Sequence, residues 1–218
     1  CGAFGTFAHQ AYTARLRGQL SSNVRQHRRP HFMRSLKNWP ALLTLAFGVH
    51  LSSSATSLDC SSLLAKASQT ELSLPSHEFD QDEKRGWRAL DAAGCTAEAA
   101  ILVERYLIGY ESNLRSLKWH QAQLLAMSGK YAQAVSVARQ AVNPSETAQH
   151  PNFKWNAYVL ATIAFLQKDS KELARLAQVI ENGVKTEPMN KTNLEIVLGL
   201  VRCIDRPYKV AYACRSAA

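Results

Sequence analysis

The stretch from residue 124 to residue 144 constrains the fold of this chain more than any other. Its sequence, LLAMSGKYAQAVSVARQAVNP, indicates the end of one helix, a tight turn at Ser128-Gly129 and a second helix. Apolar side chains recur in the second helix at offsets 0, 3, 4, 7, 10 and 11: Tyr131, Ala134, Val135, Ala138, Ala141 and Val142. Because an α-helix turns by about 100° per residue, these side chains share one face. Several are alanines, so two helix backbones can approach closely there, and the stretch predicts a helix hairpin.

Further helices are expected on both sides of this hairpin. The breaks in the sequence place the helices at 80–92, 97–112, 114–127, 130–142, 153–167, 171–182 and 192–203. Thr96 is the expected N-cap of the second helix, Asp169-Ser170 caps the sixth, and Gly183 closes it. The chain has 10 glycines and 7 prolines spread over 218 residues, and this content argues against a β-sandwich. We therefore expect an all-α fold.

Three of the expected turns share a pattern. The segments GCTAEAAILV, GKYAQAVSVA and DSKELARLAQ begin at Gly94, Gly129 and Asp169. Each has an alanine five residues after its start: Ala99, Ala134 and Ala174. The starts are 35 and 40 residues apart, and a helix pair that recurs about every 34 residues is the signature of the tetratricopeptide repeat. With Gly129 and Tyr131 at its turn and alanines behind them, the central unit is the most similar. Residues 80–188 resemble that family.

The resemblance implies a fold and a binding surface. In that family, antiparallel helix hairpins stack as a right-handed solenoid. The first helix of each pair lines a concave groove, which binds extended peptides or partner helices. The inward positions of this sequence would be Lys84, Arg85, Arg88, Ser116, Trp119, His120, Gln123, Asn156, Val159 and Ile163. Six of them are our candidate groove residues: Lys84, Arg88, Trp119, His120, Gln123 and Asn156.

These candidates have the chemistry of a binding surface. Trp119 with His120 and Gln123 offers one apolar anchor and two polar groups, the usual composition of a binding hot spot. Lys84 and Arg88, expected one helical turn apart, could hold a carboxylate. The alternatives are that Trp119 packs in the core and that Arg88 is solvated or paired with an acid at helical spacing, such as Asp91.

The positive charge of the chain is concentrated near its start. The net charge is +9, yet all 17 acidic residues lie at or after Asp59, so residues 1–58 carry +7 and the remainder carries +2. A nearly neutral body lacks the broad phosphate-neutralising surface that general nucleic-acid affinity requires. We therefore expect no nucleic-acid partner.

Residues 33–57 have the order of a secretory signal peptide. A basic start is followed by an apolar core over 39–51 and by small side chains over 52–57, with cleavage expected after Ala55 or Ser57. The 13-residue apolar run is shorter than the roughly 20 residues needed to span a bilayer. The alternative interpretation is a buried core helix.

These boundaries divide the chain into four parts. Residues 1–32 are either a basic, disordered arm or translated sequence upstream of the protein. Residues 33–57 are the signal peptide, 58–79 a lead-in, and 80–218 the tetratricopeptide-like helical domain. We expect a periplasmic or secreted protein with no stable membrane span after cleavage.

Four cysteines follow the expected cleavage site: Cys60, Cys95, Cys203 and Cys214. In an exported domain they suggest two disulfides, and four cysteines allow three pairings. The sequence-local pairing is Cys60–Cys95 with Cys203–Cys214, and each closure contributes on the order of 3 kcal/mol through the unfolded state. The alternative is that some are buried thiols. Their spacing matches no zinc module, so we expect no metal site.

An acidic cluster precedes the first expected hairpin: Glu78, Asp80, Asp82 and Glu83. Such carboxylates could serve acid–base chemistry or bind calcium, but an EF-hand loop starting at Asp80 needs glycine where Arg85 stands. Acids at the start of a helix also complement its dipole without any further role. The sequence contains no phosphate-binding glycine loop and no nucleophile elbow, so we expect no cofactor.

Three functions follow from these observations. The favoured one is a non-enzymatic exported adaptor that binds a protein or peptide through a concave groove. The alternative is a small envelope-acting enzyme or accessory factor that uses the Glu78–Glu83 carboxylates, and the third is a disulfide-stapled bundle with internal contacts alone. An open concave groove with an exposed Trp119 would favour the first. A deep pocket gathering Glu78, Asp82 and a histidine would favour the second, and the absence of both features would favour the third.

Overall fold

A computed structural model describes residues 59–109 and 114–214. Within these ranges the regular structure is α-helical and no strand occurs, so the predicted all-α class is confirmed. The helices are α2 (Cys60–Thr70), α3 (Ser76–Gln81), α4 (Gly86–Ala92), α5 (Thr96–Ile108), α6 (Arg115–Met127), α7 (Tyr131–Gln140), α8 (Glu146–Gln149), α9 (Trp155–Leu166), α10 (Ser170–Asn182), α11 (Asn190–Arg202) and α12 (Tyr208–Tyr212). The predictions for residues 1–57, including the signal peptide, lie outside the described residues.

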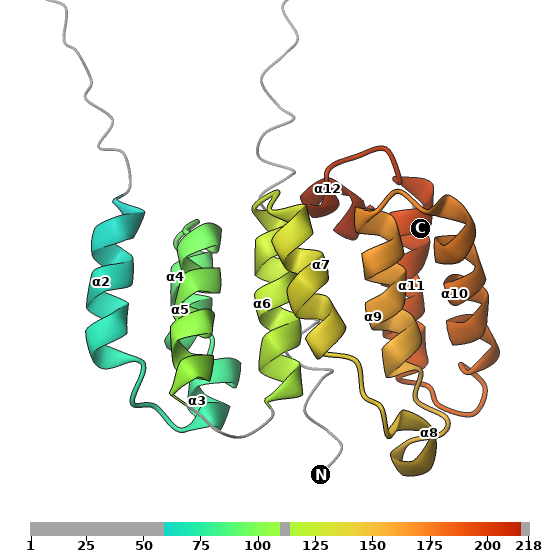
Figure 1. Ribbon diagram of the computed structural model, residues 1–218, viewed down its shortest axis with the longest axis horizontal. Helices are drawn as coiled ribbons and strands as arrows, with labels where there is room; N and C mark the ends of the chain where they lie inside the picture. The colour runs from blue at the N-terminus through green and yellow to red at the C-terminus, as the bar shows by residue number, and fades with distance from the viewer. Residues whose placement is uncertain (1–58, 110–113, 215–218) are drawn as a thin grey trace, which may run out of the picture.

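Helix pairs follow one another along the long axis of the molecule (Figure 1). α4 packs with α5, α6 with α7, and α9 with α10, and each pair contacts the next through α5 on α6 and α7 on α9. α11 packs against both helices of the third pair, and α12 folds back onto α6 and α11. α2 packs on α4 and α5 at the opposite end. The hairpins therefore pack in chain order.

The three predicted turns are closed by the same backbone hydrogen bond. At each turn an N–H donates to the carbonyl five residues earlier: Cys95 to Leu90, Lys130 to Leu125 and Asp169 to Ala164. The residue before each donor has a positive φ: Gly94 at 91°, Gly129 at 77° and Lys168 at 62°. A left-handed residue at this point ends one helix and redirects the chain into the next.

The third turn is therefore aligned one residue earlier than the sequence predicts. Counted from Lys168, the fifth residue is Leu173, which is buried, whereas Ala174 is exposed. Ala99 and Ala134 occupy that position in the first two pairs and are fully buried. The three hairpins share the turn geometry, but only the first two share the small residue behind it.

The predicted helix over 80–92 is wrong, because the chain forms two helices there. α3 ends at Gln81 and α4 begins at Gly86, whose φ is +54°. A Cβ at Gly86 would lie 2.1 Å from the carbonyl oxygen of Phe79. The N–H of Gly86 donates to Glu71 (2.9 Å) instead of to a carbonyl one helical turn earlier. The backbone at Gly86 therefore cannot continue a helix.

Both disulfides have the sequence-local pairing. Cys60–Cys95 joins the start of α2 to the residue before α5, with the Cα atoms 5.4 Å apart. Cys203–Cys214 closes the segment that carries α12, with a Cα separation of 6.5 Å. Two disulfides fit a secreted or periplasmic protein. Among the described residues, none of the helices combines the length and apolar character needed to cross a bilayer.

Candidate partner-binding surface

Helix α6 stands in the middle of the stack and carries four of the positions predicted to face inward. Ser116, Trp119, His120 and Gln123 follow the spacing of one helix face, as predicted. His120 contacts α3 and α4, Trp119 contacts α9, and Gln123 contacts α9 and α12. This face of α6 is therefore covered by other helices over much of its length.

Trp119 packs in the core. Its side chain is 2% exposed, and its ring makes edge contacts with Trp155 and Tyr158 of α9, with centroids 5.8 and 5.1 Å away. Such contacts between aromatic rings add to the energy of burial. Trp119 is therefore a core residue and not an exposed anchor, because α9, the first helix of the next pair, covers its ring.

Gln123 is buried beside two tyrosine hydroxyls. Its side-chain amide donates to Tyr158 of α9 and to Tyr212 of α12, each at 3.3 Å. The sequence does not predict Tyr208 and Tyr212 as contributors to this region, because they lie beyond the last predicted helix, 192–203. Their spacing of four residues after Pro207 was the available signal, because it is the spacing of one helix face.

His120 belongs to a buried polar cluster around Asp80. Its Nδ1 lies 2.6 Å from the carboxylate of Asp80, which also accepts a hydrogen bond from the indole of Trp87 at 3.0 Å. Arg88 donates to the backbone carbonyl of Asp80 at 2.6 Å and lies over the Trp87 ring, 4.2 Å from its centroid. The cluster joins α3 and α4 to α6. His120 keeps 16% of its side chain exposed.

The environment of Asp80 favours its ionised form. Burial raises the pKa of Asp80, but the charge and hydrogen bond of His120, together with Trp87 and Arg88, lower it by more. The hydrogen bond from Trp87 and the charge of Arg88 act in the same direction as His120. The net result is a pKa of about 2, down from 3.8. Asp80 thus acts as a structural anion that orients the imidazole.

Lys84 and Arg88 do not form the predicted carboxylate clamp. Lys84 is exposed in the bend between α3 and α4, and its N–H donates to Asp82. Arg88 is 9% exposed and points to the carbonyl of Asp80. The break at Gly86 is the physical reason, because the two residues are not one turn apart on one helix.

Asn156 fastens a loop. Its side-chain amide donates to the carbonyl of Asn143 at 2.8 Å and accepts from the N–H of Asn143 at 2.7 Å. The N–H of Asn156 donates in turn to the carboxylate of Glu146. This pairing holds the segment between α7 and α9 against the start of α9, which is a structural role.

The acidic cluster does not converge on a pocket. Asp80 points into the core, Asp82 accepts from the backbone of Lys84, and Glu78 lies on the surface 3.9 Å from Arg85. The geometry that would favour the enzyme alternative, with Glu78 and Asp82 gathered around a histidine, does not form.

One group in the described part of the chain brings three potential metal-ligating side chains together. Ligand atoms of Cys60, Cys95 and Glu98 lie within 4.8 Å of one another. The two sulfurs are joined in a disulfide, so neither is available as a thiolate ligand. The tripeptide Asn190-Lys191-Thr192 has the pattern of a glycosylation sequon, but its asparagine is not accessible. Asn190 is fully buried, and its amide donates to the carbonyls of Asn152 and Gly183.

The residues of the predicted groove therefore fall into two groups. Arg88, Trp119 and Gln123 are buried, and Asn156 is engaged with a loop. Val159 and Ile163 are buried as well. Four others reach solvent: Lys84, Arg85, Ser116 and His120, the last in part. No protein-family model matches the chain, and comparisons with curated proteins and with solved structures give no significant match.

Proposed function

We propose that the chain is an exported helical-repeat adaptor, which binds a protein or peptide partner and does not turn over a substrate. The observation that carries this proposal is the packing order, in which each helix pair contacts the next. A stack of this kind lengthens its surface with every pair, and such surfaces are used for binding. In this proposal the pairs form a short, tetratricopeptide-like, right-handed solenoid.

The proposal places the protein in the periplasm or outside the cell. Its two disulfides fit an oxidising compartment, and residues 33–57 have the order of a signal peptide. The residues from 59 onward hold 19 basic and 17 acidic side chains, so the proposed partner is a protein or peptide and not a nucleic acid.

The proposed contact surface consists of the inward residues that reach solvent. Lys84, Arg85 and Ser116 are exposed, and His120 shows part of its ring. The buried Trp119 and Gln123 support this surface from beneath. The proposal therefore differs from a groove with a tryptophan anchor. The partner contacts the polar residues Ser116 and His120 of α6 and the bend before α4.

Site-specific photo-crosslinking tests this surface. A photoreactive residue replaces Ser116 on α6 in the full chain, expressed in its native compartment. Gln133, which is exposed on α7 of the same hairpin, is replaced in a matched control. We expect a discrete crosslinked partner from position 116 and much less from position 133. Crosslinks from 133 alone would place the partner on the other helix of the pair. No crosslink from either position would contradict the adaptor function.

A further inference from the structure

The C-terminal helix α12 is seated on the stack through two aromatic side chains. Tyr208 and Tyr212 are four residues apart, share one face of the helix and are fully buried. The ring of Tyr208 lies 5.8 Å from Phe165 of α9 and 5.5 Å from Tyr212, measured between centroids. Figure 1 shows α12 at one end of the long helices, beside α6 and α11, which it contacts.

The surface beneath α12 has the composition of a ligand-binding site. Around the rings it places a small number of polar groups, which is typical of sites that orient a ligand. The N–H of Tyr208 donates to the hydroxyl of Tyr131 on α7 at 3.1 Å. Gln123 of α6 donates to the hydroxyl of Tyr212 at 3.3 Å. Four helices, α6, α7, α9 and α11, therefore contact this one short helix.

The fit of α12 is imperfect at Tyr208. Its hydroxyl is buried and makes no hydrogen bond within the described residues. Burial and the neighbouring Tyr212 raise the pKa of this phenol well above its usual value, and Gln123 and Thr162 lower it by less. We take the two groups to be close to the hydroxyl without reaching hydrogen-bonding geometry. A buried hydroxyl without a partner is unfavourable, because it loses its hydrogen bonds to water and gains none in the protein.

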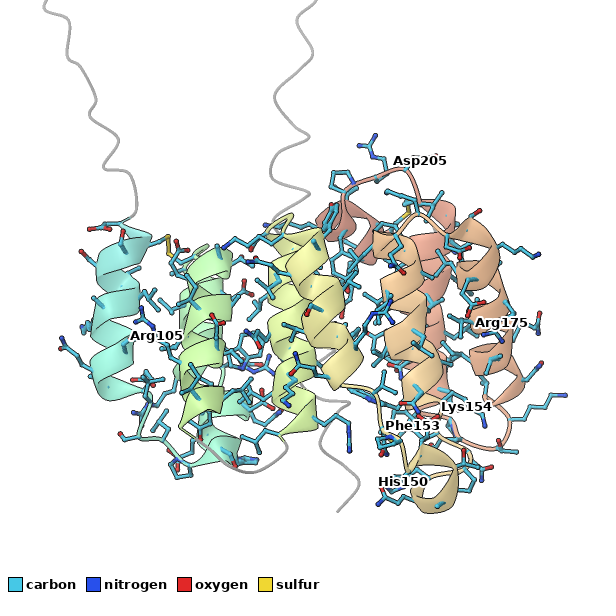
Figure 2. All side chains as sticks on the ribbon, in the orientation of Figure 1. Arg105, His150, Phe153, Lys154, Arg175 and Asp205 are labelled. Carbon is cyan, nitrogen blue, oxygen red and sulfur yellow. A yellow bond between two sulfur atoms is a disulfide. The ribbon has the colours of Figure 1, made fainter. Side chains whose placement is uncertain are left out.

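A covalent tether keeps α12 on this surface. A helix of five residues has no stability of its own in water. Cys203–Cys214 closes the loop that carries it, and Arg202 donates to the carbonyl of Cys214 at 2.8 Å. The turn before α12 is exposed, with Asp205 at the outer edge of the molecule (Figure 2). Tethering of this kind gives an effective concentration of about millimolar, enough to keep a weak site filled.

We propose that α12 is an intramolecular ligand of a helix-binding site formed by α6, α7, α9 and α11, and that a partner helix with two aromatic residues four positions apart replaces it. This inference rests on the proposed adaptor function and names its class of partner. A phenylalanine at the position of Tyr208 suits the site best, because it buries the same ring without an unpaired hydroxyl. The resident helix holds the site closed until a partner with a better fit competes for it.

A peptide-binding assay on the full chain tests the inference. The probe is a fluorescein-labelled peptide with the sequence of residues 204–213, followed by fluorescence anisotropy. Two variants release α12 in different ways. The first replaces Tyr208 and Tyr212 by alanine. The second is Gly199→Ala, whose Cβ would lie 2.5 Å from the carbonyl oxygen of Cys214 and so pushes the tail away from α11. Lys209→Ala, at an exposed position of the same helix, is the matched control.

We expect both releasing variants to bind the probe about tenfold or more tightly than the wild type, because the tethered helix no longer competes. Lys209→Ala should behave as the wild type. A probe with phenylalanine in place of the first tyrosine should bind about fivefold or more tightly than the parent probe, the equivalent of the unpaired hydroxyl. A probe with alanine in place of both tyrosines should not bind.

Two results would overturn the inference. The first is a Gly199→Ala protein that melts cooperatively and binds no probe. The second is loss of cooperative melting in both variants, which would make α12 a fixed part of the core. A chain that binds the probe but crosslinks no partner from position 116 or 133 would remove the adaptor function and leave the helix-binding site beneath α12 standing. A chain that crosslinks a partner from position 116 and binds no probe would remove this inference and leave the adaptor function standing.

Discussion

Asp80 shows how one side chain can join three elements and make their packing depend on pH. Its carboxylate is hydrogen-bonded to the indole of Trp87 on α4 and to the imidazole of His120 on α6. Its pKa is lower in the folded protein, at about 2, than its ordinary value of 3.8. The unfolded chain therefore takes up the proton more readily. The stability contributed by Asp80 is complete above its ordinary pKa and is lost as the pH falls from 3.8 towards 2.

We expect Asp80→Asn to lower the free energy of unfolding by about 2 kcal/mol at about pH 5, the equivalent of the pKa shift. Asparagine keeps an acceptor for Trp87, so the loss reports on the charge. At about pH 2.5 the difference in unfolding free energy between this variant and the wild type should be less than about half of its value at pH 5. Asp80 is then partly protonated in the folded wild type, so most of the stability from its charge has been lost. Urea unfolding at both pH values measures it. Asp82→Asn, an exposed carboxylate nearby, is the control, and a constant difference across the range would refute the assignment.

Trp119 separates the core interpretation from the groove interpretation at a single position. Because its ring is enclosed by Trp155 and Tyr158, Trp119→Ala should leave a cavity and cost about 3–5 kcal/mol of unfolding free energy. Ser116→Ala, one turn away and exposed, should change it by less than about 0.5 kcal/mol. Chemical denaturation of both variants gives the comparison. A loss of unfolding free energy below about 1 kcal/mol for Trp119→Ala would contradict the core interpretation and indicate a ring exposed at the surface.

At the scale of elements, the glycines with positive φ determine where one helix ends and the next begins. Gly94 and Gly129 have positive φ and open space where a Cβ would lie, so alanine should cost only the conformational strain of about 1–2 kcal/mol. Gly86→Ala adds a clash with the backbone of Phe79 and should cost about 3 kcal/mol or more. Gly109→Ala, at ordinary φ with its nearest neighbour at 3.6 Å, should be nearly neutral. Thermal melts of the four variants should follow this order, and similar losses at Gly86 and Gly109 would contradict it.

The same glycines explain how far the sequence predicts the elements. The α6–α7 hairpin is predictable because the apolar period and Gly129 agree. The break after α3 is missed because FDQDEKRGWRAL has charged and apolar residues compatible with one helix, and only Gly86 marks the change. The third turn is misaligned because Lys168 adopts a backbone conformation that glycine adopts in the other two. Helices α8 and α12, of four and five residues, are too short to show a period.

The candidate surface is less predictable than the fold for a reason that belongs to the whole molecule. The spacing of residues on α6 correctly places Trp119, His120 and Gln123 on one face. It does not reveal that α9 and α12 cover part of that face, because those contacts join residues far apart in the chain. The partner of Gln123 in α12, Tyr212, is 89 residues away. Local periodicity predicts which face of a helix turns inward, and the packing of the complete stack decides what reaches solvent.

The two disulfides should differ in their effect on the whole molecule because they close loops of different length. Cys60–Cys95 spans 35 residues and Cys203–Cys214 spans 11. Loop-closure entropy assigns about 4 kcal/mol to the first and about 3 kcal/mol to the second. Replacing Cys60 and Cys95 by alanine should therefore lower the free energy of unfolding by more than the same change at Cys203 and Cys214.

Urea unfolding without reductant measures both losses, and the wild type with added reductant should lose the most. The Cys203–Cys214 disulfide also closes the loop that carries α12. The variant without this disulfide should therefore show the smaller loss of stability together with the release of α12. If the variant at Cys203 and Cys214 proved the less stable of the two, loop length would not govern the difference. The native contacts of α12 would then contribute more to the fold than its five residues and its imperfect fit at Tyr208 suggest.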